Sequence, residues 1–380
     1  MLKKILFITG TRADFGKLKS LIQITSEDST FEVHIFATGM HLLEQYGYTV
    51  NEIEKSGFTN IYRFNNNSHG ISMDVTLART IEGLSTYVAN NRPDLLVVHG
   101  DRGEALAGSI VGALNNILVA HIEGGEVSGT VDELIRHAVT KMSHLHFVSN
   151  EEARKRLIQL GEIPDNIHVI GSPDMDVMVS NNLPSLAEVK THYEIPFEHY
   201  AILMFHPVTT ELHLMEQAAS DLFGAAEQSD INFIGIYPNN DAGSDMIMKV
   251  LSEYQTHPRF RIFPSLRFEY FLTLLKNARF MLGNSSAGIR EAPFYGVPTV
   301  NVGTRQSGRS IDNPNIIHCE YDGSEILNAI NKAAAMSKLN CQAHFGSGNS
   351  DQRFLQLLMG EALWKTPAQK RFNDIHWINA

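Results

Sequence analysis

The sequence predicts an α/β protein made of two Rossmann-like, doubly wound domains that face a cleft. With 380 residues and 43% hydrophobic side chains, the chain can bury two cores. Short apolar runs recur along it without two-residue alternation, and each is followed by glycine or polar residues and then by an amphipathic segment. This pattern is typical of parallel strands that helices cover on both faces.

The first domain is expected to span residues 1–172, and its strands are predicted from apolar runs. Each run ends in polar or glycine residues, which is where a strand would give way to the next helix. In chain order the runs occupy residues 4–10, 31–39, 94–101, 117–125, 144–150 and 167–172.

A second domain is expected over residues 173–365, joined to the first by a more polar stretch near residues 172–200. Its predicted strands occupy residues 201–207, 231–238, 260–265, 279–286 and 297–303. The tail has helical periodicity that Pro367 should interrupt. We expect residues 366–380 to form a C-terminal helix that crosses back to the first domain.

Composition excludes several classes of partner. The formal net charge of -11 argues against a nucleic-acid ligand, because a phosphate-binding surface needs a basic excess. Cys319 and Cys341 match neither a metal-site spacing nor a disulfide framework, which favours a reducing, cytoplasmic setting. The N-terminal apolar run is too short for a signal sequence or a membrane span, so we expect no membrane association.

The stretch LGNSSAGIREAP, residues 282–293, predicts an anion site of the second domain. Small residues between a strand and a helix leave backbone N–H groups that can point at a diphosphate. Glu291, one turn on, could accept hydrogen bonds from a ribose diol. An ordinary serine N-cap is the alternative. The groups expected at the anion are the N–H groups of Ser286, Ala287 and Gly288 and the hydroxyls of Ser285 and Ser286.

The loop after the first strand, GTRADFGK, has charge where nucleotide folds usually have glycine. Arg12 could supply a forked guanidinium to a phosphate, with Lys17 as a second cation. A charged side chain would then reach a phosphate held by the other domain. Asp14 is expected to cap the following helix.

Three carboxylates follow strands of the first domain or a glycine-rich loop. Asp101 and Glu123 end apolar runs, and Asp132 follows EGGEVSGT. Convergence of the three at one sheet edge would raise at least one pKa, which suits acid–base chemistry. Capping is the alternative for Asp132, in TVDELIRHAV, and a hard-metal site is another for the set. We expect no metal, since no aspartate-rich run such as D-x-D lies near these strands.

Histidines and an aromatic complete the candidate set. A lone histidine is more often packed or hydrogen-bonded than catalytic, which is the expectation for His99, His121 and His137. His206 is the exception, because it ends the first strand of the second domain, where a cation could meet a diphosphate. Phe268 in RFEYF could pack near a base, and Asn239 in YPNND is expected to bind the nucleotide.

With these residues together, the sequence resembles the hydrolysing UDP-N-acetylglucosamine 2-epimerases of bacterial sialic-acid synthesis. The resemblance runs nearly end to end, and its ordered motifs are far more specific than a lone glycine motif. They are ITGTRADFGKLK, ATGMH, HGDR, ALAG, HIEGGE, SGTVDE, IRH, GSPD, MFHPVTTE, YPNND, FEYF and GNSSAGIREAP.

The resemblance implies a GT-B-type fold with UDP in the interdomain cleft. It implies conversion of UDP-N-acetylglucosamine and water to UDP and N-acetylmannosamine, by elimination to 2-acetamidoglucal and then hydration. Its catalytic carboxylates correspond to Asp101, Glu123 and Asp132. Its nucleotide and diphosphate contacts correspond to Arg12, His206, Ser285, Ser286 and Glu291.

No cofactor is expected, since elimination and addition need no nicotinamide and no clear G-x-G-x-x-G motif is present. A homodimer or higher homo-oligomer is the default assembly. Three other functions stay open: a non-hydrolysing 2-epimerase, a hydrolysing epimerase of a UDP-diacetamido sugar for legionaminic acid, and a UDP-sugar-binding transferase or sensor.

Overall fold

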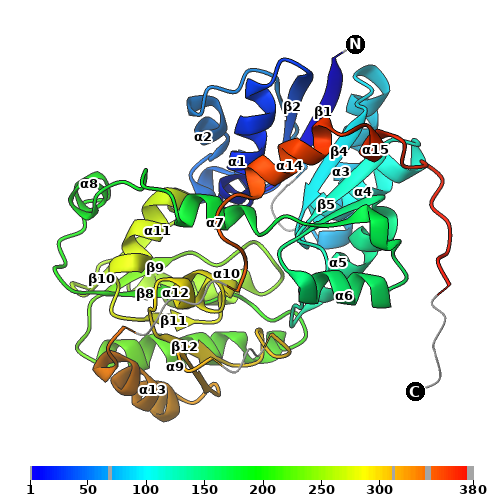
Figure 1. Ribbon diagram of the computed structural model, residues 1–380. Helices are drawn as coiled ribbons and strands as arrows, with labels where there is room; N and C mark the ends of the chain where they lie inside the picture. Colours follow the sequence, from blue (N-terminus) through cyan, green and yellow to red (C-terminus); the bar gives the residue numbers. More distant parts are fainter. Residues whose placement is uncertain (1, 67–70, 310–312, 339–343, 375–380) are drawn as a thin grey trace. The chain divides into compact units, whose positions relative to one another are not determined.

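The computed structural model describes residues 2–66, 71–309, 313–338 and 344–374 (Figure 1). Contacts divide the chain into two compact units. Unit 1 comprises Met1–Glu126, Asp132–Asn181 and His344–Ala380, and unit 2 comprises Val127–Val131 and Asn182–Ala343.

The sheet of unit 1 is entirely parallel, with strand order β3-β2-β1-β4-β5-β6-β7. The order reverses between β1 and β4, which is the switch point of a doubly wound sheet, where ligands bind. Its strands are β1 (Lys3–Thr9), β2 (Phe31–Ala37), β3 (Ile61–Arg63), β4 (Leu95–His99), β5 (Leu118–Ile122), β6 (Leu145–Val148) and β7 (Ile167–Val169).

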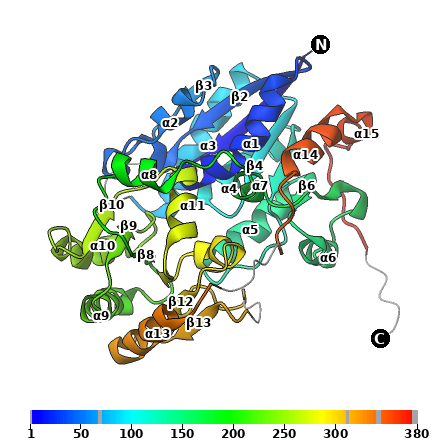
Figure 2. The same cartoon turned by 60° about the vertical axis from the view of Figure 1, so that its left-hand side comes forward.

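Alternate side chains of β1 and β4 pack against helices on opposite faces of this sheet. Ile5 and Phe7 share a core with residues of α1 and α14, and Figure 2 shows α1 lying over the strands. Gly108 of α4 packs closely on Ile8 and Val98, so α4 covers the other face. The helices of unit 1 are α1 (Arg12–Glu27), α2 (Val50–Lys55), α3 (Met73–Asn90), α4 (Gly103–Leu114), α5 (Val131–Met142), α6 (Glu151–Gln159), α7 (Pro173–Met178), α14 (Ser350–Met359) and α15 (Glu361–Trp364), with 3-10 turns at Gly39–Leu42, Glu44–Tyr46 and Pro164–Asn166.

Unit 2 repeats this architecture with a parallel sheet of order β10-β9-β8-β11-β12-β13, whose switch point lies between β8 and β11. Its strands are β8 (Ala201–Met204), β9 (Phe233–Ile236), β10 (Phe260–Phe263), β11 (Met281–Gly283), β12 (Thr299–Val302) and β13 (Ile316–Cys319). Its helices are α8 (Leu186–His192), α9 (Met215–Gln228), α10 (Ser244–Glu253), α11 (Phe268–Asn277), α12 (Glu291–Phe294) and α13 (Gly323–Ala335), with 3-10 turns at Leu212–Leu214 and Ser286–Gly288. The predicted fold class of two doubly wound α/β domains is confirmed.

Two edge strands were absent from the prediction. β3 has only three residues, two of them exposed, and β13 is mostly half-buried, so neither forms the continuous apolar run of a covered strand. Each pairs with a neighbour on one side only. Edge strands of this kind are recognised through their pairing rather than their composition.

The C-terminal region differs from its predicted placement. The chain returns to unit 1 from residue 344 rather than 366, and α7, beyond the expected boundary at residue 172, also belongs to unit 1. Residues 366–374 are not helical: the Ala368 carbonyl accepts from His144 Nε2 at 2.9 Å, and Lys370 Nζ donates to the carbonyls of Thr140 and Ser143. Residues 375–380 of the predicted C-terminal helix lie outside the described residues.

The helices that the structure describes include none that combines the length and the apolar character needed to cross a membrane.

Candidate functional site

The loop from β1 into α1 is shaped by reciprocal hydrogen bonds and by a close contact at Gly10. Thr11 is the N-cap and accepts from the Asp14 backbone N–H at 3.1 Å, while Asp14 Oδ2 accepts from the Gly10 N–H at 3.1 Å. A Cβ at Gly10 would lie 2.6 Å from the Glu104 carboxyl carbon, so a larger residue there would require the Glu104 side chain to move. Asp14 therefore supports the helix start as predicted, and its second oxygen, Oδ1, contacts His99.

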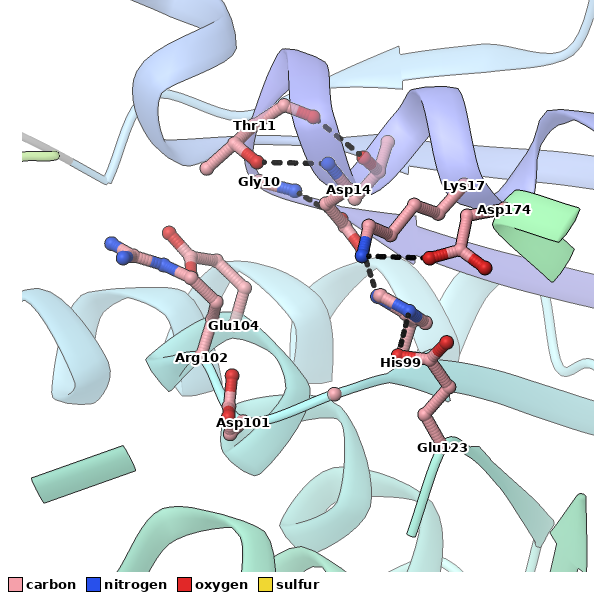
Figure 3. A network of polar contacts seen from close by, with 12 residues as sticks. Gly10, Thr11, Asp14, Lys17, His99, Asp101, Arg102, Glu104, Glu123 and Asp174 are labelled. Atoms are coloured by element: carbon pink, nitrogen blue, oxygen red, sulfur yellow. Dashed lines mark hydrogen bonds and ion pairs between the residues drawn. The ribbon is translucent and has the colours of Figure 1, made fainter. Parts of the chain in front are cut away.

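A histidine with a side chain only 9% exposed bridges two carboxylates at the switch point of unit 1. His99 Nδ1 lies 2.8 Å from Asp14 Oδ1, and its Nε2 lies 3.2 Å from Glu123 Oε2. Figure 3 shows the two carboxylates on opposite sides of the imidazole. Burial disfavours the charged ring, but hydrogen bonds and charge from Asp14 and Glu123 outweigh burial and raise the pKa of His99 to about 9. His99 is an imidazolium at neutral pH.

Glu123 is held at both its backbone and its side chain. Its N–H donates to the Phe147 carbonyl at 2.9 Å, and its carbonyl accepts from Arg136 at 2.6 Å. The Ser172 hydroxyl donates to Oε1. The residue has φ of 62°, a left-handed conformation that is uncommon for glutamate and that typically marks a constrained functional position.

Asp101 and Glu123 are brought together by one arginine. The Arg136 guanidinium contacts the Asp101 carboxylate and also donates to the Glu123 carbonyl. Asp132 lies four residues before Arg136 on α5, so the two share a helix face. Arg136 thus links the Asp101 carboxylate to the backbone of Glu123, and Asp132 lies one turn before it on the same helix. That the three carboxylates raise the pKa of at least one of them stays a prediction.

The two predicted phosphate-binding cations of unit 1 both have carboxylate partners. Arg12 is the first residue of α1 and lies 3.9 Å from the Glu52 carboxylate. Lys17, one turn further on, lies 3.2 Å from Oδ2 of the buried Asp174 in α7 (Figure 3). A phosphate that binds Arg12 or Lys17 would therefore meet a cation that already has a carboxylate partner.

His206 is fixed at the carboxyl end of β8 in unit 2. Its backbone N–H donates to Asn284 Oδ1 at 2.7 Å, and its carbonyl accepts from Asn284 Nδ2 at 2.9 Å. Nδ1 accepts from the Asn239 backbone N–H at 3.0 Å. An imidazole that accepts at Nδ1 carries its proton on Nε2. The role of His206 as a cation at a diphosphate stays a prediction.

The segment after β11 differs from the predicted helix N-terminus. Ser286–Gly288 forms a single 3-10 turn, and α12 begins only at Glu291. The Ser285 hydroxyl accepts from the Ala287 N–H at 3.3 Å, and the Gly288 N–H donates to the Ser285 carbonyl at 3.1 Å. Two of the three N–H groups predicted to face an anion are therefore used inside the turn, and the serine N-cap alternative applies to Ser285.

The other predicted residues of unit 2 are Glu291, Phe268 and Asn239. Glu291 is the first residue of α12 and Phe268 is the first residue of α11, and both are buried. The Asn239 side chain contacts Asp241. Within the part of the chain that the structure describes, no three His, Cys, Asp or Glu side chains are grouped as a metal site.

Four residues of the network were not predicted as functional: His99, Ser172, Arg136 and Asp174. His99 was expected to be a packed or hydrogen-bonded histidine, as His121 is, whose Nε2 donates to the Gly100 carbonyl at 2.8 Å. The signal for His99 was its place in HGD, at the end of the strand that pairs with β1. Arg136 lies on α5 and Ser172 lies after β7, so both come close to Glu123 only in the folded protein.

Comparison with known proteins gives a consistent family. The model of the UDP-N-acetylglucosamine 2-epimerase family matches residues 23–359. A UDP-N-acetylglucosamine 2-epimerase of Neisseria meningitidis serogroup B is 50% identical and covers 99% of this chain and 100% of that protein. A UDP-N,N'-diacetylbacillosamine 2-epimerase (hydrolyzing) of Legionella pneumophila is 35% identical and covers 94% of this chain and 96% of that protein.

Among solved structures, the chain is similar to the UDP-GlcNAc 2-epimerase of Methanocaldococcus jannaschii in complex with UDP-GlcNAc and UDP. The TM-score is 0.81 at 22% identity, with 93% of this chain and 99% of that chain covered. This likeness identifies the fold as the two-domain GT-B type.

Proposed function

Because this chain belongs to the UDP-N-acetylglucosamine 2-epimerase family, we propose that it is a hydrolysing member, which converts UDP-N-acetylglucosamine and water to UDP and N-acetylmannosamine. The observation that carries the proposal is the set of titratable side chains at the β1–β4 switch point, where Glu123 contacts His99 and Asp101 contacts Arg136. A reaction that moves a proton at carbon and expels a diphosphate needs such a set.

The first step is an elimination. A carboxylate removes the proton from C2 of the sugar, the electrons of the C2–H bond form the C1–C2 double bond, and the C1–O bond breaks with its electrons leaving on UDP. The products are 2-acetamidoglucal, UDP and a protonated carboxyl. Glu123, Asp101 and Asp132 are the candidates for this proton transfer.

The second step is a hydration. An acid delivers a proton to the opposite face of C2, and the hydroxyl of water adds to C1 while the remaining proton of that water returns to the acid's conjugate base. The carboxyl protonated in the first step releases its proton to solvent. Delivery of the proton to the opposite face inverts the configuration at C2, and the product is free N-acetylmannosamine.

Arg12, Lys17 and His206 are the groups proposed to contact the leaving diphosphate. A neutral His206 would donate a hydrogen bond from Nε2 to a phosphate oxygen without a proton transfer. The nucleotide contacts proposed with it are Asn239, Phe268, Ser285, Ser286, Ala287, Gly288 and Glu291.

Two observations support hydrolysis. The resemblance of the ordered motifs is to the hydrolysing enzymes of sialic-acid synthesis, so N-acetylmannosamine would be a precursor of that sugar. The Legionella pneumophila relative also acts hydrolytically by its name. The use of only two cysteines favours a cytoplasmic enzyme, and a homodimer is the proposed assembly.

A second candidate substrate is a UDP-diacetamido sugar. The 35% identity to the Legionella pneumophila protein over 94% of this chain favours it as the alternative. The two substrates differ at the sugar ring, and the same elimination and hydration would act on either.

Proton NMR in deuterated water tests the function. The protein is incubated with UDP-N-acetylglucosamine while sugar and nucleotide signals are followed together. Free N-acetylmannosamine with deuterium at C2, formed together with UDP, is the expected result. UDP-N-acetylmannosamine as the product would instead identify a non-hydrolysing enzyme, and turnover of the diacetamido sugar alone would identify the second candidate.

A further inference from the structure

We propose that His99 is a positioning residue that, anchored by Asp14, fixes the Glu123 carboxylate and holds it ionised, so that Glu123 enters the reaction as the proton acceptor. The proposal rests on the proposed function for the chemical step. The arrangement of the three side chains is independent of the substrate.

The geometry leaves the Glu123 carboxylate one orientation. Oε2 contacts His99 Nε2 at 3.2 Å, and Oε1 accepts from the Ser172 hydroxyl. Because both oxygens have a partner on the protein and the side chain is buried, rotation of the carboxylate would break two hydrogen bonds. The left-handed backbone of Glu123 directs the side chain to this place.

His99 is itself anchored on its other nitrogen. Asp14 Oδ1 lies 2.8 Å from Nδ1, and Asp14 is held in turn by the Gly10 N–H through its second oxygen. An imidazole with a carboxylate on each side is stabilised as the doubly protonated cation, which donates from both nitrogens. The chain Gly10–Asp14–His99–Glu123–Ser172 therefore links the end of β1 to the start of α7.

The charges around His99 are balanced by separate pairs. From α1 it faces Asp14 and from the end of β5 it faces Glu123, while Lys17 of α1 pairs with Asp174 of α7 and Arg136 of α5 pairs with Asp101. Two carboxylates act directly on the ring, and the pKa of about 9 follows from them against the opposing effect of burial.

An ionised carboxylate can accept a proton and has none to give. Glu123 would take the C2 proton in the elimination, as the C2–H electrons form the double bond and UDP leaves with the C1–O electrons. The proton that later arrives on the opposite face of C2 must come from another acid. The candidate for that acid is Asp132, the third predicted carboxylate, in the first turn of α5.

The first test is the pH profile of the His99→Gln enzyme. Glutamine keeps a polar side chain at the site but removes the positive charge that favours ionised Glu123. We expect kcat at pH 7 to fall about 100-fold or more with KM changed less than threefold, and the acidic limb of the profile to move to higher pH. A uniform loss at every pH with an unmoved limb would mean a purely structural role and overturn the proposal.

The matched control is His34→Gln. His34 also bridges a hydroxyl and a carboxylate, with Nδ1 2.6 Å from Tyr87 Oη and Nε2 2.7 Å from Glu32 Oε1, but it lies within β2. Its pH profile should match that of the unsubstituted protein. Ser172→Ala should lower kcat and move the acidic limb in the same direction but by less than His99→Gln, since it removes a hydrogen bond to Glu123 and no charge.

The second test requires no turnover and separates this inference from the proposed function. The His99 imidazole is titrated by NMR in the unsubstituted protein, in Glu123→Gln and in Asp14→Asn. We expect titration near pH 9 in the first and a shift to lower pH in each variant. Titration near 6.5 in the unsubstituted protein would overturn the inference even if the enzyme is active, and titration near 9 would sustain the charged bridge even if UDP-N-acetylglucosamine is not the substrate.

Discussion

At the scale of single residues, the three carboxylates are distinguished by their partners. Glu123 is bound to His99 and Ser172, Asp101 to Arg136, and Asp132 stands in the first turn of α5. Their environments differ although each has the same functional group. Such differences are what allow neighbouring carboxylates to take separate roles in one reaction.

Removal of each carboxylate charge tests these roles. We expect Asp101→Asn, Glu123→Gln and Asp132→Asn to lower kcat by about 100-fold or more while each still binds UDP in calorimetry. Asp165→Asn, at an exposed position before β7, is the control and should turn over normally. Unchanged rates in all three test variants would remove the carboxylates from the mechanism.

Arg12 is expected to contribute to nucleotide affinity rather than to turnover. Loss of a charge-assisted contact costs roughly 1.5 to 3 kcal/mol, so Arg12→Ala should weaken UDP binding about 10- to 150-fold in calorimetry. The existing ion pair with Glu52 favours the lower end of that range. Arg154→Ala, which loses only a surface pair, is the control; equal affinities of the two variants would exclude Arg12 from the diphosphate.

At the scale of elements, α14 is attached to unit 1 through Asp176 of α7. The carboxylate accepts from the Ser350 N–H at 2.8 Å, the Ser350 hydroxyl at 2.6 Å and the Asp351 N–H at 3.1 Å, and also from the Ser20 hydroxyl at 2.9 Å. One side chain therefore ties α1, α7 and α14 together. Figure 1 shows these helices side by side.

Asp176→Ala should lower the free energy of unfolding by about 2 kcal/mol or more, because four donors in a part-buried site lose their acceptor at once. Urea denaturation followed through tryptophan fluorescence measures this loss. Asp322→Ala is the comparison, since Asp322 caps α13 at an exposed position and should cost about 1 kcal/mol. Equal losses of unfolding free energy in the two variants would mean that the additional hydrogen bonds of Asp176 do not stabilise the protein.

The sequence was sufficient to predict those strands and helices whose own residues give a clear pattern. Covered strands such as β4 and β5 are continuous apolar runs, so their presence, and the polar residues at their ends, could be predicted. The turn at Ser286 was mistaken for a helix start because serine and glycine are typical of both. The bridge at His99 could not be predicted, since it depends on which strands are neighbours and on the conformation of Glu123.

At the scale of the whole molecule, opposing pKa shifts should set the pH range of stability. Burial lowers the pKa of His41 to about 4 and of His121 to about 3, so their contributions to stability are present above 6.5 and are lost as the pH falls through those values. The contribution of His99, with its raised pKa, is present below 6.5 and is lost as the pH rises through about 9.

We therefore expect the urea midpoint to be highest near neutral pH and to fall on both sides. His41→Gln should be less stable at pH 7 but should lose less than the unsubstituted protein between pH 6.5 and 4.5, because it has no ring to protonate. A midpoint that is flat from pH 4.5 to 9 would contradict this assignment.

The core of unit 1 includes residues from both ends of the chain. Phe354 of α14 is fully buried and packs on Phe147 at 4.9 Å and on Phe7 at 6.4 Å between ring centroids. Phe354→Ala should lower the free energy of unfolding by about 3 to 5 kcal/mol. Phe372→Ala, at a position 85% exposed, should change it by less than about 0.5 kcal/mol, and a similar loss for both would show that α14 does not complete the core.

The return of the chain to unit 1 at residue 344 also fixes an order of events during synthesis. Unit 2 ends at residue 343, so all of its strands are translated before Phe354 and Leu358. Unit 1, although it begins first, must wait with an apolar face of its sheet exposed until the last helices emerge. The nascent enzyme is therefore expected to complete its second unit before its first, and to depend on chaperones in that interval.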